Sequence, residues 1–232
     1  MAKIHLIIPA AGSSLRMGQA LPKQFTVLGN NKTLIEIVES VFSRISQIDS
    51  INIAVSKEQN HIEILKNKFS NKTHVHYCGG ASRAETVLNA INQIKCMADE
   101  WIMVHDAARI GITEVMIHQF IDAIGKDKVG GIMALPASDT VKRVNKQNEI
   151  VSTESRDEIW LAQTPQMFRF KLLKKALENF DGIPTDESEA IESLGYRPKL
   201  FKGTPLNFKV TFPDDMKRAE KSLEILRVNK HD

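Results

Sequence analysis

The sequence is poor in cysteine. Cys78 and Cys96 are the only two among 232 residues, and they show none of the paired spacings of a zinc site. Two cysteines are too few to stabilise a small secreted protein by disulfides, so we expect reduced thiols and a cytoplasmic protein.

Long hydrophobic runs are missing as well: the apolar stretch at residues 4–8 stops at Pro9. It is far shorter than the roughly 18 residues of a membrane span and has no signal-peptide cleavage pattern, so we expect no membrane partner.

An excess of either charge is also missing. The chain has 31 Lys and Arg against 28 Asp and Glu, a formal net charge of +3. Domains that bind nucleic acid non-specifically are usually strongly basic, so we expect no nucleic acid partner. Hydrophobic residues make up an ordinary 42%. A chain of this length can bury roughly 70% of its unfolded surface, which is enough for a core without disulfides or metals.

Short apolar runs alternate with helical patterns along the first 135 residues. The runs at 4–8, 51–55, 75–77, 101–104 and 130–135 predict strands, and residues 33–48, 62–69, 82–97 and 114–124 predict helices. Strands separated by helices of this length indicate right-handed crossovers. We therefore expect an α/β fold with a three-layer, doubly wound, mainly parallel sheet of Rossmann-like type. Ligands bind at the carboxyl ends of such strands.

Residues 136–160 break this alternation. Short alternating strands at 140–144 and 149–151 flank a polar turn, which predicts a β-hairpin arm. A two-stranded ribbon is marginal alone, so the arm must pack on something, and a second subunit is a candidate. Beyond the arm we expect helices at 171–180 and 187–194, strands at 199–201 and 208–211, and a last helix from Pro213 to 228. Residues 1–232 are thus expected to form one domain carrying this arm.

The first candidate site is the turn that follows the first strand, at residues 9–18. Its small residues let the backbone approach a ligand, and successive N–H groups can form an anion-binding nest. Neither G-x-G-x-x-G nor G-x-x-x-x-G-K-[ST] is present, which counts against ordinary dinucleotide and P-loop sites. Arg16 and Lys23 add positive charge. We interpret the turn as a phosphate-binding loop; a solvated turn with two chance cations is the alternative.

The second candidate site follows the predicted strand at 101–104. Asp106 and Arg109 come directly after it, on the expected ligand face of the sheet. A carboxylate there can hold Mg²⁺ together with substrate phosphates, and an arginine can bind a phosphate through two hydrogen bonds. The alternative is an Asp106–Arg109 ion pair that only stabilises the turn and binds no ligand. We expect His105 to be a satisfied strand residue rather than a catalyst.

Seven short motifs follow one another in order along nearly the whole chain. They are Ala10-Ala11-Gly12 with Arg16-Met17, Pro22-Lys23-Gln24, Gly79-Gly80 with Arg83, Val104-His105-Asp106-Ala107-Ala108-Arg109, Asp139-Thr140-Val141-Lys142-Arg143, Thr164-Pro165-Gln166 and Thr185-Asp186-Glu187. In this combination the sequence resembles the 2-C-methyl-D-erythritol 4-phosphate cytidylyltransferase family. The resemblance implies a nucleotidyltransferase that joins CTP to 2-C-methyl-D-erythritol 4-phosphate for isoprenoid precursor synthesis. It also implies Mg²⁺ and a homodimer with an exchanged arm.

The resemblance further implies roles for individual residues. Those that would hold the triphosphate and the transition state are Arg16, Lys23 and Lys209. Those that would border CTP are Ala10, Ala11, Gly12, Gly80, Ala81, Thr86 and Asp106, with Asp106 also meeting the metal. Those that would face the acceptor are Arg109, Thr164 and Thr185, joined by Thr140 and Arg156 from the partner's arm. The acceptor phosphate is already anionic near neutral pH, so the implied reaction needs no strong general base.

Two alternatives stay open at this point. A ribitol 5-phosphate cytidylyltransferase would share the first loop and Pro-Lys-Gln, but the His-Asp-Ala-Ala-Arg run and the Lys-Arg pair of the arm favour methylerythritol phosphate. A non-catalytic nucleotide-binding module on the same fold is the other. Such a module is expected to have lost a cation or the acid, whereas Arg16, Lys23, Asp106 and Lys209 are all present.

Overall fold

The main sheet has seven strands. The computed structural model describes residues 2–12, 21–29 and 31–228, apart from the side chains of 227 and 228. The strands are β1 (Ile4–Pro9), β2 (Ile48–Ala54), β3 (Thr73–His76), β4 (Trp101–Val104), β5 (Gly130–Pro136), β8 (Trp160–Arg169) and β9 (Lys199–Lys202). Their order across the sheet is β3-β2-β1-β4-β8-β5-β9. Neighbours pair in parallel except β8, which lies antiparallel between β4 and β5. The predicted mainly parallel α/β sheet is confirmed.

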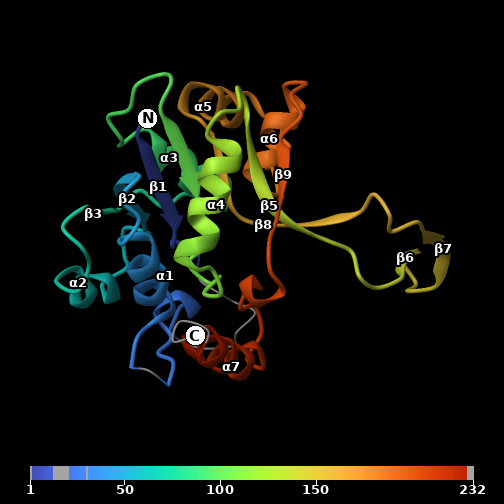
Figure 1. Ribbon diagram of the computed structural model, residues 1–232, viewed down its shortest axis with the longest axis horizontal. Coiled ribbons are helices and arrows are strands. Elements are labelled where there is room, and N and C mark those ends of the chain that lie inside the picture. Colours follow the sequence, from blue (N-terminus) through green and yellow to red (C-terminus); the bar gives the residue numbers. More distant parts are fainter. Residues whose placement is uncertain (1, 13–20, 30, 229–232) are drawn as a thin grey trace.

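Helices cover both faces of this sheet (Figure 1). They are α1 (Leu34–Phe42), α2 (His61–Lys66), α3 (Arg83–Ile91), α4 (Glu114–Ile124), α5 (Phe170–Asn179), α6 (Glu187–Ser193) and α7 (Asp215–Val228). The alternating side chains of β1 show the layering, since Leu6 and Ile8 pack with α1, α2, α4 and α7 whereas Ile7 packs with α3, α5 and α6. Two hydrophobic cores therefore enclose the sheet. Among the described residues, no helix combines the length and apolar character needed to cross a bilayer.

Several predicted elements are too long or wrong. The helices predicted at 33–48 and 82–97 end at Phe42 and Ile91. The predictions were too long because apolar residues beyond these ends, such as Ile45, are buried in the core although they lie in turns. Residues 208–211 form no strand; Val210 N donates instead to Ala108 O at 2.9 Å. Strand β8 was not predicted, because its two glutamines and Pro165 are typical of a loop. The tertiary structure satisfies Gln166: its amide donates to Asp186 Oδ2 at 2.8 Å, and its side-chain oxygen accepts from Ser188 N at 3.0 Å.

The predicted hairpin arm is present. It consists of β6 (Val141–Val144) and β7 (Ile150–Glu154), an antiparallel pair that forms a sheet of its own. Figure 1 shows it projecting well away from the main sheet, at the end of the long connections that leave β5 and return to β8. Three of its apolar side chains are more than half exposed: Val144, Ile150 and Val151.

Candidate active site

A cleft of about 470 Å³ lies at the carboxyl ends of β1 and β4, where the topology places ligands. It is lined by Pro9, Ala10, Ala11, Gly12, Lys23, Gln24, Gly80, Ala81, Ser82, Arg83, Thr86, Asp106, Ala107, Ala108 and Lys209. All seven residues predicted to border CTP therefore meet in one cleft, together with Lys23 and Lys209. Arg16 lies outside the described residues.

The described part of the first loop is held in place by the Pro-Lys-Gln motif. Gln24 is buried, and its side-chain amide donates to Ala10 O at 2.7 Å and to Gly12 O at 3.1 Å. Lys23 begins the short 3-10 turn η2 (Lys23–Phe25), and its Nζ donates to Val210 O at 2.8 Å. The motif thus ties the loop after β1 and places an ammonium group beside it.

The Gly79-Gly80 turn forms the opposite wall and needs glycine for close packing. A Cβ on Gly79 would lie 2.5 Å from the Cβ of Ala11 in the first loop, so a larger residue would push the two walls apart. Gly80 N donates to Thr86 Oγ1 at 3.0 Å. Ser82 caps the helix α3 that follows, accepting from Glu85 N at 3.0 Å. These contacts hold the backbone of the Gly79-Gly80 turn and of the start of α3 in place along the cleft.

Asp106 is the charged centre of the cleft. Its carboxylate lies 2.9 Å from Arg83 Nε, 2.9 Å from Lys209 Nζ and 3.5 Å from Arg109 Nε. Burial would raise the pKa of Asp106, but these three positive charges outweigh it and hold the pKa far below its usual range. Asp106 is therefore ionised at any physiological pH and holds three cations at the cleft.

The sequence assigned no role to Arg83, although it is a main organiser of this centre. Its guanidinium also binds Glu187, with distances of 2.6 Å to Oε1 and 3.1 Å to Oε2. Burial opposes the charge of Arg83, but Glu187 and Asp106 together raise its pKa. Burial also raises the pKa of Glu187, against the effect of Arg83. One signal was available: an arginine in the first turn of a helix meets the unfavourable end of the helix dipole unless acidic partners compensate it.

Arg109 and Thr164 contact Asp106 but do not line the cleft. Arg109 donates from Nη1 to Asn207 O at 3.0 Å, and burial lowers its pKa. The buried Thr164 hydroxyl accepts from Asp106 N at 3.0 Å and lies 3.1 Å from His105 Nδ1. Thr164 therefore positions the turn that carries Asp106, and its contact with the acceptor stays a prediction.

His105 behaves as the satisfied strand residue that the sequence predicted. It is fully buried, and its Nε2 lies 2.9 Å from Arg109 O. Burial lowers the pKa of His105 to about 4, so the ring is neutral at physiological pH. It is enclosed by structural partners and does not line the cleft.

The other predicted acceptor residues lie apart from the cleft of the same chain. Thr185 lines a separate cavity of about 680 Å³, next to Asp186 and Trp160. Thr140 and Arg156 lie exposed on the arm or at its base. One chain alone therefore does not bring these three residues to the cleft.

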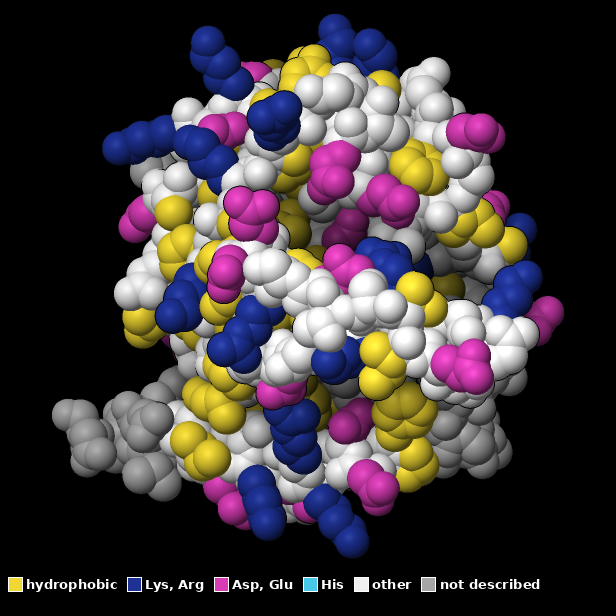
Figure 2. All heavy atoms as spheres, turned by 90° about the vertical axis from the view of Figure 1, so that its right-hand side faces the viewer, with side chains coloured by type: hydrophobic (Ala, Val, Ile, Leu, Met, Phe, Trp, Pro, Cys, Tyr) yellow, Lys and Arg dark blue, Asp and Glu magenta, His cyan; other side chains and the backbone are white. Residues whose placement is uncertain are grey.

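Charge on the arm side of the molecule is mixed. Figure 2 faces the side from which the arm projects, and Lys and Arg side chains alternate there with Asp and Glu and with hydrophobic side chains. Neither sign forms a continuous field over the described part of this face. The gathering of Lys23, Lys209 and Arg83 is thus a local feature of the cleft.

These features define the class of protein. A parallel α/β sheet, a first loop of small residues closed by Pro-Lys-Gln, and lysines around a single carboxylate suit a nucleotide polyphosphate. The fold and this cleft are those of an α/β nucleotidyltransferase. The family model of 2-C-methyl-D-erythritol 4-phosphate cytidylyltransferase matches residues 4–225, and the chain belongs to that family.

Individual relatives agree with this assignment. The chain is 39% identical over 225 residues to the 2-C-methyl-D-erythritol 4-phosphate cytidylyltransferase of Nitrosomonas eutropha, covering 95% of this chain and 96% of the relative. It is 40% identical over 230 residues to that of Paraburkholderia phytofirmans, covering 94% and 95%. The crystal structure of the Francisella tularensis enzyme superposes with a TM-score of 0.80 at 33% identity, over 95% of this chain and all of that one. The predicted family is confirmed, and the ribitol 5-phosphate alternative is not favoured.

Proposed function

We propose that this protein transfers the cytidylyl group of CTP to 2-C-methyl-D-erythritol 4-phosphate. The products are 4-diphosphocytidyl-2-C-methyl-D-erythritol and pyrophosphate, in the non-mevalonate route to isoprenoid precursors. The observation that carries this proposal is that one cleft, in a member of this family, gathers all seven predicted CTP-binding residues with Lys23 and Lys209.

The chemistry follows from charge. An oxygen of the acceptor phosphate attacks the α-phosphorus of CTP, a new P–O bond forms, and the bond to the β-phosphate breaks with its electron pair leaving on pyrophosphate. Because the attacking group is already an anion, the main obstacle is repulsion between phosphates. A unit charge pair at 4 Å attracts by about 4 kcal/mol at an effective dielectric constant of 20. Lys23 and Lys209 are therefore proposed to neutralise the triphosphate and its transition state.

Asp106 is the proposed protein ligand of Mg²⁺. Among the described residues that line the cleft, it is the only carboxylate. Mg²⁺ is typically held by one or two carboxylates together with substrate phosphates, so this donor set fits an ion shared with CTP. The neighbouring cations keep Asp106 ionised, and Lys209 would have to give up its contact with Oδ2 for a metal to bind there. When bound, the ion supplies further charge neutralisation on the phosphates.

We further propose that residues 1–232 form one catalytic domain that works as a homodimer in the cytoplasm. Cys78 and Cys96 are free thiols, in keeping with a reducing compartment. The isolated two-stranded arm, with exposed Val144, Ile150 and Val151, is marginal without a covering surface. A second copy would cover it and bring Thr140 and Arg156 to the acceptor side of its partner's cleft.

Subunit complementation tests the exchanged arm. We expect K23A and R156A each to be nearly inactive, because each removes a phosphate-binding cation from both sites of its dimer. In a mixed dimer one site carries both changes and the other carries neither. Random exchange of equal amounts makes half of the dimers mixed, so about one quarter of wild-type activity should return. If the re-equilibrated mixture is no more active than its two components, the arm does not cross between subunits.

Acceptor choice tests the reaction itself. With CTP and Mg²⁺, we expect pyrophosphate release to be at least about tenfold faster in kcat/KM with 2-C-methyl-D-erythritol 4-phosphate than with ribitol 5-phosphate, since small differences in substrate shape give discrimination of this order. The K23A protein, purified identically, is the control for contaminating enzymes. A preference for ribitol 5-phosphate would overturn the proposed substrate.

A further inference from the structure

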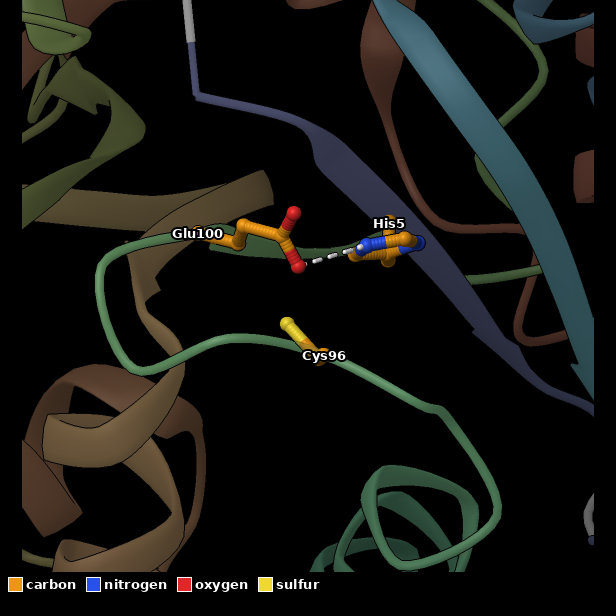
Figure 3. Close-up of side chains that lie close together, drawn as sticks. All are labelled: His5, Cys96 and Glu100. Carbon is orange, nitrogen blue, oxygen red and sulfur yellow. Dashed lines mark hydrogen bonds and ion pairs between the residues drawn. The ribbon is translucent and has the colours of Figure 1, made fainter.

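A second cluster of reactive side chains lies at the opposite end of the sheet from the cleft. His5 stands near the start of β1, Glu100 directly precedes β4, and Cys96 lies in the segment between α3 and β4. One nitrogen, oxygen or sulfur atom from each of the three lies within 4.8 Å of the other two. Figure 3 shows the Cys96 sulfur directed toward the Glu100 carboxylate and the His5 ring. An imidazole, a thiol and a carboxylate together are a donor set typical of zinc.

The surroundings of His5 match those of a metal-binding histidine. Its Nδ1 lies 2.8 Å from Ser50 Oγ, and Asn52 donates to the same hydroxyl at 2.9 Å. Metal-ligating histidines use their second ring nitrogen in this way, which sets the orientation of the ring. With the proton on Nδ1, Nε2 would offer its lone pair to a metal in place of its hydrogen bond to Glu100 Oε2.

Glu100 is held in a similar manner. Its Oε2 accepts from Met97 N at 2.7 Å and lies 3.4 Å from His5 Nε2. Bond lengths near 2.0–2.3 Å place neighbouring ligand atoms of a tetrahedral zinc ion about 3.5 Å apart. The nitrogen and oxygen already have this separation, and Cys96 lies outside the regular elements, so its approach breaks no strand pairing.

The cluster also has a path to solvent. A cavity of about 710 Å³ beside it is lined by His5, Ser50, Asn52 and residues 93–95, but not by Cys96 or Glu100. His5 and Glu100 are buried, while Cys96 is half-buried. An ion would therefore approach from the side of the half-buried Cys96 thiol, where water can supply a fourth ligand.

We propose that His5, Cys96 and Glu100 form a binding site for a divalent transition metal of the zinc type. The site would connect the segment after α3 to the starts of β1 and β4. On binding, the thiol proton leaves to solvent, the metal forms bonds to the Cys96 sulfur, the His5 nitrogen and a Glu100 oxygen, and these ligands displace water molecules from the hydrated ion. The spacing of these residues in the sequence gave no sign of the site, because its ligands come from positions 5, 96 and 100. The proposal is independent of the cytidylyltransferase reaction.

Cobalt binding tests this site without using activity. We expect Co²⁺, added to chelator-treated, tag-free full-length protein, to bind with one equivalent and produce a near-ultraviolet thiolate-to-cobalt charge-transfer band. Zn²⁺ should abolish the band, whereas excess Mg²⁺ should leave it unchanged. C96S should lack the band, and E100Q should bind Co²⁺ at least tenfold more weakly. C78S is the matched control, because it removes the other half-buried thiol and should keep the band.

Several results would overturn the proposal: no band in the wild type, a band that persists in C96S or disappears in C78S, or equal affinity in E100Q and wild type. Far-ultraviolet circular dichroism checks that C96S is folded. If it is not, the decision falls to Zn²⁺ and the melting temperature. Zn²⁺ should raise that temperature in the wild type and in C78S, and clearly less in E100Q; an equal rise in all three rejects the site.

Discussion

Replacing Lys23 by alanine should lower kcat by about 10²–10³-fold, the usual effect of removing a group that stabilises charge in a transition state. Lys23 lines the cleft together with Ala10, Ala11 and Gly12, and we propose that its ammonium binds the triphosphate. Steady-state pyrophosphate release at saturating CTP and acceptor measures the effect. Turnover close to that of the wild type would remove Lys23 from the proposed mechanism.

The control for this experiment separates catalysis from folding. The Lys23 ammonium also donates to Val210 O at 2.8 Å, so the variant loses one structural hydrogen bond. Loss of a hydrogen bond of this kind costs about 1–3 kcal/mol, which urea unfolding can measure. K57A is the matched variant, because Lys57 is exposed in the turn that precedes α2, and its turnover should equal that of the wild type.

The second large effect concerns stability. Replacing Arg83 by methionine should reduce the free energy of unfolding by about 3–5 kcal/mol, because removing one partner of a buried ion pair leaves uncompensated charge. Arg83 bridges Asp106 and Glu187, whose side chains are only 9% and 1% exposed. Urea unfolding followed by circular dichroism provides the measurement.

A double-mutant cycle distinguishes lost pairing from lost packing. In the R83M/E187Q protein the glutamate charge is gone as well, so part of the stability should return, and the coupling between the two changes should be clearly non-zero. R44M is the surface control: Arg44 pairs with Glu114 away from the arm, its side chain is 50% exposed, and little change is expected. A loss below about 1 kcal/mol in R83M would show that the ion pairs of Arg83 contribute little to the stability of the fold.

Most of the cleft proposed to bind CTP was predictable because its residues belong to compact motifs. Ala10 to Gly12, Gly80 and Asp106 each follow a strand that hydrophobic patterning identified, and Lys23 belongs to the Pro-Lys-Gln motif. The parallel topology then brings the ends of those strands together. The positions of the residues predicted to face the acceptor were harder to predict from the sequence, since Thr185 lines another cavity and Thr140 and Arg156 lie on or beside the projecting arm.

The central position of β8 was not predictable from local patterns. Strand identity is usually visible as a run of apolar or alternating residues, and β8 contains two glutamines and a proline. Gln166 becomes compatible with burial only because Asp186 and Ser188 N supply hydrogen-bonding partners about twenty residues away. The cost of burying an amide is therefore offset by contacts that no short window of sequence contains.

By itself, the sequence determined the alternation of strands and helices, the hairpin arm, the small-residue loop with Pro-Lys-Gln, and the family, because periodicity and short motifs are local properties of the chain. Only the tertiary structure decided that β8 runs antiparallel between β4 and β5. It also decided that Arg83 joins Asp106 to Glu187, and that His5 meets Cys96 and Glu100. The physical reason is the same in each case: these contacts join residues tens of positions apart, and their energies depend on burial and on partners that exist only after the chain has folded.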